Sequence, residues 1–384
     1  DNNQEDANPE ENTNDEEGQD QANQNKNKDL EIYIGTPEEN AEQMLEDLNL
    51  EEKISQMIMA IASSADDLKQ DVGGYTILYD SNNLAEDIEN SQSSNSIPAI
   101  YSSDDEGGEV QRVTDGEKSQ RYYGKKAEED GLESAQEELI SDYKERAQTI
   151  LESGINMNLA PVADLSSDNS YMGQYERSFG PDFDITSSLL EKAVQVYEEK
   201  GLISCLKPFP GYGNGQNTHE PQQYHLTANK TRVNRYIDVF KKGIEAGAPA
   251  ILRSHLYYDA IDSENPAILS KEVGNIIRND LNFDGVVITD ALNMQTITKY
   301  YTDVAELAVK CVEAGNDMLM TDKVDESIQA IKQAVNSGRI DEATIDESVK
   351  RILTMKFEYG VMDTYNDKGN NLNRPGDGNP FQGA

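Results

Sequence analysis

Apolar and polar positions follow two periods in this chain. From about Thr36 onward, short apolar runs alternate with stretches whose apolar residues recur at helical spacing. The apolar runs predict strands at residues 75–78, 97–101, 155–161, 202–206, 250–254, 285–289 and 317–321. The periodic stretches predict a helix that opens at Asn49, with apolar positions Ile54, Met57 and Ile58, and helices at 134–153, 186–200, 233–246, 271–281, 304–314, 326–336 and 345–359.

Regular alternation of strands and helices indicates an α/β fold with a parallel sheet and helical crossovers. About seven or eight strands favour a closed (β/α)₈, TIM-like barrel over an open doubly wound sheet. No dinucleotide-type GxGxxG follows the first predicted strand, which also disfavours the open sheet.

Composition divides the 384 residues into one domain with two polar tails. Residues 1–29 are mostly Asn, Gln, Asp and Glu with almost nothing apolar, and we expect them to form a disordered acidic linker. Residues 30–362 are the predicted barrel domain, and residues 363–384 a polar C-terminal tail. Acidic tails of this kind often tether extracytoplasmic domains, so we expect a secreted or membrane-tethered protein whose anchor lies upstream or has been removed.

Charge and cysteine content exclude several classes of partner. The chain has 33 Lys and Arg against 73 Asp and Glu, a net charge of −40 that repels nucleic acids and anionic lipid surfaces. No apolar run approaches the ~20 residues of a membrane span. Cys205 and Cys311 are expected to be buried free thiols, and no His or Cys spacing predicts a metal site or a cofactor.

Polar residues at the predicted strand ends are the candidates for chemistry, because catalytic groups of such barrels lie where the strands end. These residues are Asp104, Asp164, Lys207, His255 and Asp290, and the loop after Lys207 also carries His219. Asp290 directly follows the predicted strand Gly285–Thr289 and precedes a helical segment. A carboxylate placed so is partly desolvated yet close to backbone amides, which suits it to attack an electrophilic carbon.

The order of six short motifs resembles glycoside hydrolase family 3. They are Asp104-Asp-Glu-Gly-Gly, Asn158-Leu-Ala-Pro-Val-Ala-Asp164, Glu176-Arg-Ser-Phe-Gly180, Lys207-Pro-Phe-Pro-Gly-Tyr-Gly213 with Asn217-Thr-His219, Ser254-His255 and Ile288-Thr-Asp290. The resemblance covers about Thr36 to Met362 and is closest to the family's single-domain β-N-acetylglucosaminidase branch. It implies a retaining, exo-acting β-N-acetylhexosaminidase that acts on a saccharide or cell-wall glycan.

The resemblance also implies a role for each residue. Asp290 stands at the nucleophile position, and His219 at the acid/base position of an Asp-x-His dyad that replaces the usual second carboxylate. A histidine near neutrality can protonate the leaving oxygen and then deprotonate water. The residues that stand at sugar-binding positions are Asp104, Asp164, Arg177, Lys207 and His255, with Asp164 orienting its neighbours.

Two positions depart from the family pattern. The Lys-His pair is Lys207-Pro208 here, and the dyad aspartate is Asn217. A neutral amide stabilises the protonated imidazole less than a carboxylate, which leaves less of the acid form of His219 at neutral pH. Three interpretations therefore stay open: a working but slow hexosaminidase, a degenerate barrel that binds glycan or protein, and a glycoside phosphorylase in which phosphate takes the acid/base role.

Several features leave alternatives open. Residues 113–133 have no counterpart in the family pattern, and they wall the pocket, contact a polymer or form a solvated helical insertion. Specificity for the sugar and the oligomeric state are not encoded in any local pattern. Trp is absent, so tyrosines would have to stack on a sugar; the candidates are Tyr171, Tyr175, Tyr212, Tyr257 and Tyr258, none of them assigned to the site.

Overall fold

Eight parallel strands form a barrel in the computed structural model, which describes residues 33–215, 217 and 220–363. Their order around the barrel is β10-β7-β5-β4-β3-β2-β1-β11. A parallel bridge between Ile288 and Met318 and a bond from the Thr289 amide to the Met318 carbonyl (3.0 Å) join β10 to β11 and close the ring. The predicted α/β barrel is confirmed.

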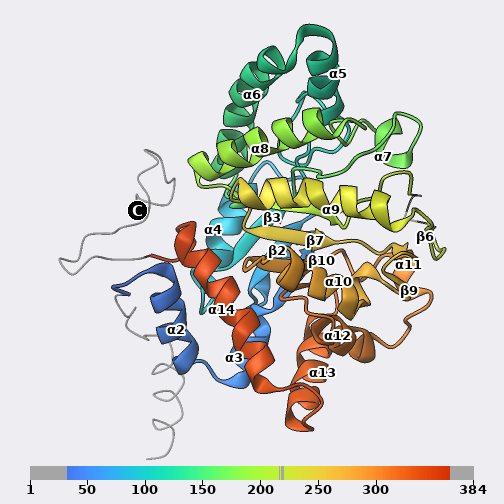
Figure 1. Cartoon of the computed structure of the whole chain (residues 1–384). Coiled ribbons are helices and arrows are strands. Elements are labelled where there is room, and N and C mark those ends of the chain that lie inside the picture. Colours follow the sequence, from blue (N-terminus) through green and yellow to red (C-terminus); the bar gives the residue numbers. More distant parts are fainter. Residues whose placement is uncertain (1–32, 216, 218–219, 364–384) are drawn as a thin grey trace, which may run out of the picture.

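The barrel strands are short, and helices surround them (Figure 1). The strands are β1 Ile58–Ala62, β2 Gly74–Ile77, β3 Ile100–Ser103, β4 Met157–Asn158, β5 Ile203–Phe209, β7 Ala250–Arg253, β10 Val286–Thr289 and β11 Leu319–Thr321. The longer helices are α2 Pro37–Asp47, α3 Leu50–Gln56, α4 Leu84–Ser94, α5 Gln120–Asp130, α6 Leu132–Glu152, α8 Phe183–Lys200, α9 Lys230–Glu245, α12 Val304–Glu313, α13 Val324–Asn336 and α14 Glu342–Glu358. Shorter helices are α7 Tyr171–Gln174, α10 Lys271–Asn275 and α11 Gln295–Thr298.

Local sequence explains where the first helices begin. The Asn49 side chain accepts hydrogen bonds from the Glu51 and Glu52 amides, and Glu52 bonds back to the Asn49 amide. Thr36 and Glu39 make the same reciprocal box at α2. Each box satisfies amides that the helix itself leaves without acceptors.

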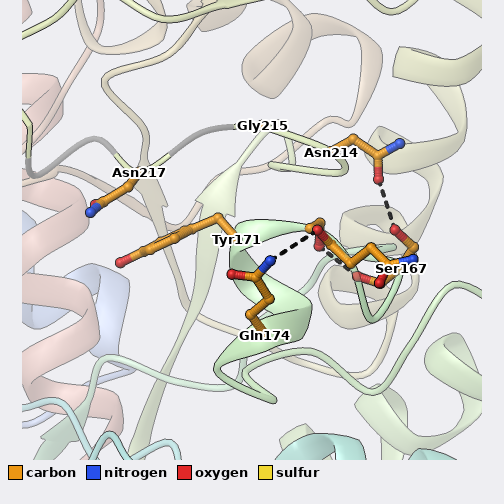
Figure 2. A pocket seen from close by; sticks show the side chains of 8 residues that line it. Ser167, Tyr171, Gln174, Asn214, Gly215 and Asn217 are labelled. Atoms are coloured by element: carbon orange, nitrogen blue, oxygen red, sulfur yellow. Dashed lines mark hydrogen bonds between the residues drawn. The ribbon is translucent and has the colours of Figure 1, made fainter.

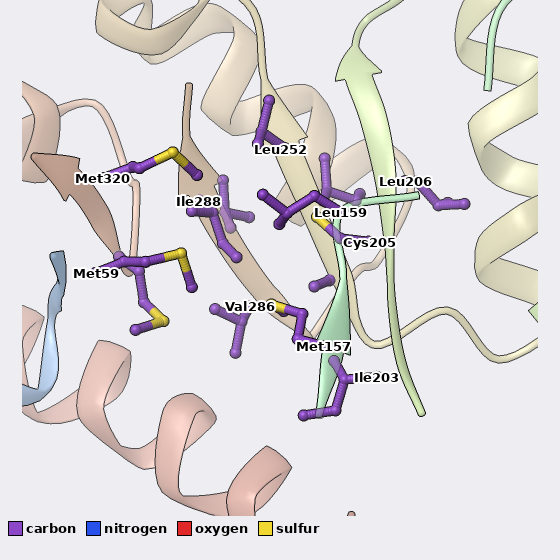
Figure 3. Packing of buried hydrophobic residues seen from close by; sticks show 14 of the residues in the cluster. Met59, Met157, Leu159, Ile203, Cys205, Leu206, Leu252, Val286, Ile288 and Met320 are labelled. Carbon is purple, nitrogen blue, oxygen red and sulfur yellow. The ribbon is translucent and has the colours of Figure 1, made fainter. Parts of the chain in front are cut away.

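Alternation along the strands fills the barrel interior with apolar side chains. Figure 3 shows Met59, Cys205, Leu252, Ile288 and Met320 converging there from different strands. Leu206, one position on from Cys205, points away, and its side chain packs against Gly243 of α9. Successive side chains of a strand face opposite sides, so one parity of each strand lies inside the barrel and the other faces the helices.

One sequence-based expectation is wrong, and one small sheet was not predicted. Ile58 does not continue the helix that opens at Asn49: α3 ends at Gln56, and Ile58 begins β1, whose five residues are all buried. A strand buried on both faces is apolar throughout and has no period to distinguish it from a helix. A small sheet of β6 His225–Leu226, β8 Tyr257–Tyr258 and β9 Asp262–Pro266, formed by the connecting loops, also escaped prediction.

Cys205 and Cys311 are buried free thiols, as predicted. Residues 113–133 contain helix α5, but the insertion is not simply solvated, because Arg121 and Tyr123 are buried. In the described part of the chain, none of the helices has the length and apolarity that a membrane crossing requires. The two predicted tails, apart from Asp363, lie outside the described residues.

Candidate active site

Strand alternation brings three charged side chains to the inner side of one barrel rim. Asp104 lies two residues after Ser102 and therefore faces the same side of the strand. The Ser102 hydroxyl points into the barrel interior, where it lies 3.7 Å from the Met59 sulfur. Lys207 and Asp290 likewise lie two residues after Cys205 and Ile288, whose side chains face the barrel interior. All three stand at the carboxyl ends of their strands, the face on which such barrels carry their active sites.

Two acidic and two basic side chains form an ion cluster at this rim. Glu106, which is only 1 % exposed, accepts two hydrogen bonds of 2.8 Å from Arg177. Its carboxylate also lies 2.7 Å from the Lys207 ammonium. Lys207 in turn bonds Asp104. We call Asp104, Glu106, Arg177 and Lys207 the ion cluster; its formal charges sum to zero.

The cluster keeps its members charged in spite of burial. Burial alone would raise the pKa of Glu106, but the charges of and hydrogen bonds from Arg177 and Lys207 outweigh it and lower the pKa to about 2. Burial opposes the charge on Lys207, yet Asp104 and Glu106 raise its pKa above the ordinary value. The site therefore presents fixed charges that can hold the hydroxyl groups of a sugar.

The three acidic residues after β3 divide between two tasks. Asp104 and Glu106 face the cluster, whereas Asp105 between them accepts bonds from the amides of Arg112 (2.9 Å), Val113 (3.1 Å) and Thr114 (3.0 Å). Gly107 follows with φ of 90°, and a Cβ there would lie 2.2 Å from the Lys118 carbonyl oxygen. Only glycine permits this turn.

Asp290 continues the ladder of β10 by one residue. Its amide donates to the Arg253 carbonyl of β7 (3.0 Å), and its Oδ1 accepts from the Ala291 amide (2.8 Å). The Asp290 side chain is half-buried. His255, 1 % exposed, lies 3.0 Å through Nε2 from the Ala291 carbonyl, so this nitrogen carries the proton and His255 holds the backbone beside Asp290.

Asp164 is fully buried and fixes the loop after β5. It accepts a hydrogen bond from the Gly213 amide (2.8 Å) and one from the Ser166 hydroxyl. Burial raises its pKa, and these bonds offset part of that rise. The same loop leads to Asn217, which the structure describes, and to His219, which lies outside the described residues. Asp164 therefore anchors the start of this loop at Gly213.

A polar cleft opens between the loops after β4 and β5 (Figure 2). Its volume is about 350 Å³. The lining residues are Ser167, Asn169, Ser170, Tyr171, Gln174, Asn214, Gly215 and Asn217. Burial raises the pKa of Tyr171, and the nearby Arg177 of the ion cluster offsets part of that rise, so one wall of the cleft lies close to the cluster.

Comparisons with known proteins identify the family. Residues 49–355 match the glycosyl hydrolase family 3 N-terminal domain. The chain belongs to glycoside hydrolase family 3. An uncharacterised secreted glycosyl hydrolase of Arthroderma benhamiae is 27 % identical over 274 residues, which are 68 % of this chain and 75 % of that protein. The β-hexosaminidase LpqI of Mycobacterium tuberculosis is 25 % identical over 270 residues, 68 % of each chain.

The solved structures agree with this family. The structure of a family 3 β-N-acetylglucosaminidase from a Paenibacillus species superposes with a TM-score of 0.73 at 28 % identity. The match covers 85 % of this chain and 66 % of that one. As a family 3 member, the chain is a glycosidase that acts on O-glycosyl bonds.

Glu106 is the member of the site that the sequence did not single out. Glu106 belongs to the motif that begins at Asp104, and the strand-end criterion selects only the first carboxylate of that motif. Its spacing of two from Asp104 is the available signal, because residues i and i+2 of an extended segment face the same side. Its partners Arg177 and Lys207 are 71 and 101 residues away, beyond the reach of any local pattern.

Proposed function

We propose that this glycosidase is a retaining, exo-acting β-N-acetylhexosaminidase with Asp290 as nucleophile. The proposal is supported mainly by the alternation of side chains along β10. Ile288 faces the barrel interior, so Asp290, two residues on, faces the inner side of the rim where the ion cluster lies. Asp104, Arg177 and Lys207 bind the hydroxyls of the non-reducing sugar, and His255 and Asp164 position the backbone around them. The names of the relatives supply the expected sugar, an N-acetylhexosamine.

The reaction proceeds by double displacement. The Asp290 carboxylate attacks the anomeric carbon as the glycosidic oxygen departs with a proton from His219, and a glycosyl ester forms. Water, deprotonated by His219, then cleaves the ester, so the anomeric configuration is retained. Asn217 in place of a carboxylate weakens the proton transfer, because it stabilises the imidazolium less.

Asn217 and Pro208 also favour a second candidate, a barrel that binds glycan without turnover. Two substrates separate the candidates. A nitrophenyl β-N-acetylglucosaminide needs no proton for departure of its phenolate, whereas chitobiose does. Turnover of the aryl glycoside supports the hexosaminidase, and absence of turnover with measurable sugar binding supports the binding protein. Acceleration by phosphate with release of a sugar 1-phosphate would instead indicate a phosphorylase.

We further propose an extracytoplasmic location with turnover of cell-wall or other extracellular glycan. The relatives include a secreted glycosyl hydrolase, and the acidic composition of residues 1–29 suits a tether. Fractionation of cells, with the protein found in the cytosol, would contradict this location.

A further inference from the structure

Helix α5 holds the segment that carries Arg177 at two points, one on each side of that residue. The Arg121 amide in the first turn of α5 donates to the Glu176 carbonyl (3.2 Å). The Arg121 guanidinium donates to the Phe179 carbonyl (3.1 Å). A Cβ at Gly124 would lie 1.7 Å from the same Phe179 oxygen, so the helix backbone approaches the segment with no side chain between them. The chain is therefore fixed both before and after Arg177.

Glu176 takes a backbone conformation that a residue other than glycine adopts only at a cost in free energy. Its φ is 52°, in the left-handed region. Its carboxylate accepts a hydrogen bond from the Ser119 hydroxyl (2.9 Å) and one from the Lys125 ammonium (2.9 Å). Ser119 is the N-cap of α5, so the carboxylate lies at the positive end of that helix. Hydrogen bonds from Lys125 and Ser119 also lower the pKa of Glu176, which keeps it ionised.

The helix takes its own position from the barrel rim. Gln120, which is 1 % exposed, exchanges two hydrogen bonds with the backbone of Val162: it donates to the carbonyl (3.0 Å) and accepts from the amide (2.7 Å). Val162 forms a parallel bridge with Lys207 of the ion cluster. Arg177 is thus held at both ends, its guanidinium by Glu106 and its backbone by a helix fixed to the rim.

We propose that helix α5 positions Arg177 for sugar binding and that Glu176 is the positioning residue through which it acts. This inference rests on the proposed sugar-binding role of Arg177. Without the contacts to α5, residue 176 relaxes toward the negative φ that L-residues favour, and the change redirects the chain at Arg177. A shift of a binding group by about 1 Å is enough to weaken the reaction markedly. Residues 113–133 then act on the sugar from behind the site.

Two substitutions at Glu176 separate its backbone conformation from its side chain. Glu176→Ala removes the carboxylate and leaves a residue that adopts φ of 52° at a cost. We expect kcat/KM for the aryl glycoside to fall about 10-fold, mainly through a higher KM, because Arg177 binds the sugar before the reaction begins. Glycine adopts this φ freely, so Glu176→Gly should recover kcat/KM to within about 3-fold of wild type. Equal losses for the two variants overturn the inference.

Lys125→Met tests the same contact from the side of the helix, with Glu176 left in place. Because this ion pair is partly exposed, we expect kcat/KM to fall only about 3-fold. The matched control is the ion pair between Lys144 of α6 and Glu199 of α8 (3.2 Å), which is also partly exposed. Lys144→Met and Glu199→Ala should leave kcat/KM unchanged. An equal fall in these controls would reveal a general effect of surface charge and overturn the inference.

An effect that passes through Arg177 should disappear when Arg177 is absent. In an Arg177→Ala background, Glu176→Ala should lower kcat/KM by less than about 2-fold, whereas independent effects would give the same loss of about 10-fold as in wild type. Arg177→Gln provides a second background in case Arg177→Ala does not fold. A further loss of about 10-fold would show that Glu176 acts independently of Arg177 and would overturn the inference.

Binding of free N-acetylglucosamine separates this inference from the proposed activity. If wild type fails to hydrolyse the aryl glycoside but binds the sugar, the hexosaminidase proposal is wrong, and calorimetric affinities should follow the same order of variants. If hydrolysis occurs but Glu176→Ala and Lys125→Met behave as their controls do, the hexosaminidase proposal stands and the positioning inference alone is overturned. If wild type neither hydrolyses the glycoside nor binds the sugar, both are wrong.

Discussion

Glu106 and Arg177 form a two-point ion pair at the rim of the barrel, with both donor–acceptor distances at 2.8 Å. Glu106 is 1 % exposed, and it also holds Lys207 at 2.7 Å. One buried carboxylate therefore sets the positions of both cations that we assign to sugar binding. This makes Glu106 a positioning residue whose effect on the reaction passes through Arg177 and Lys207.

Glu106→Gln should lower kcat/KM by about 10²-fold, because displacement of a binding group by about 1 Å is enough for such a loss. Removing one partner of a buried ion pair should also lower the free energy of unfolding by ~3–5 kcal/mol. Steady-state kinetics and urea unfolding measure the two effects. Glu109→Gln, an exposed glutamate in the same loop, should change neither.

The pH dependence gives Glu106 an independent signature. Its pKa falls from 4.5 to about 2 on folding, so it contributes stability that is present above pH 4.5 and is lost as the pH falls toward 2. The stability difference between wild type and Glu106→Gln should be constant above about pH 5 and shrink below pH 4.5. A difference that stays constant down to about pH 2.5 would contradict the assigned ion pair.

Asp290→Asn should lower turnover of the aryl glycoside by about 10³-fold or more, because an amide cannot form the glycosyl ester. Mass spectrometry after reaction with a 2-fluoro glycosyl donor should detect one added sugar on wild type and none on the variant. Asp284→Asn, an exposed aspartate just before the same strand, is the control and should retain activity. Labelling of the Asp290→Asn variant would show that another residue attacks.

Asn217→Asp should raise the turnover of chitobiose by up to about 10²-fold, whereas the turnover of the aryl glycoside should change little. A carboxylate at residue 217 raises the pKa of a neighbouring imidazole and supplies more of the acid form at neutral pH. The pH profile of kcat/KM should move its basic limb to higher pH. An unchanged profile would show that His219 does not depend on residue 217.

Lys356 on α14 offers a test of stability away from the site. It is fully buried, with Nζ 2.6 Å from the Gln56 side-chain oxygen, and burial lowers its pKa to about 7. The unfolded chain therefore binds more protons than the folded one between pH 7 and 10.5, and stability should rise with pH across this window.

Lys356→Met removes this dependence. The free energy of unfolding of wild type should gain about 1 kcal/mol per pH unit relative to the variant between pH 7 and 10. Urea unfolding at several pH values measures it. Lys350→Met, a partly exposed lysine on the same helix, should leave the slope of wild type intact. Parallel slopes for wild type and Lys356→Met would contradict the lowered pKa.

Local sequence determined the helices and most strands of this protein, because periods of 3.6 and 2 and capping residues such as Asn49 act over a few neighbours. It also placed Asp290 at the end of a strand, and the motif order gave the family. It did not identify β1, since a run buried on both faces has no period.

Only the tertiary structure decided which distant groups meet. Burial of a carboxylate is favourable only beside its counter-ions, and the barrel brings Glu106 to Arg177 and Lys207 across 71 and 101 residues of chain. The anchoring of Gly213 by Asp164 and the uncharged cleft arise in the same way, from loops that closure of the ring sets side by side. Periodicity in the sequence predicts the side of an element on which a residue lies, whereas closure of the barrel determines which distant residues it contacts.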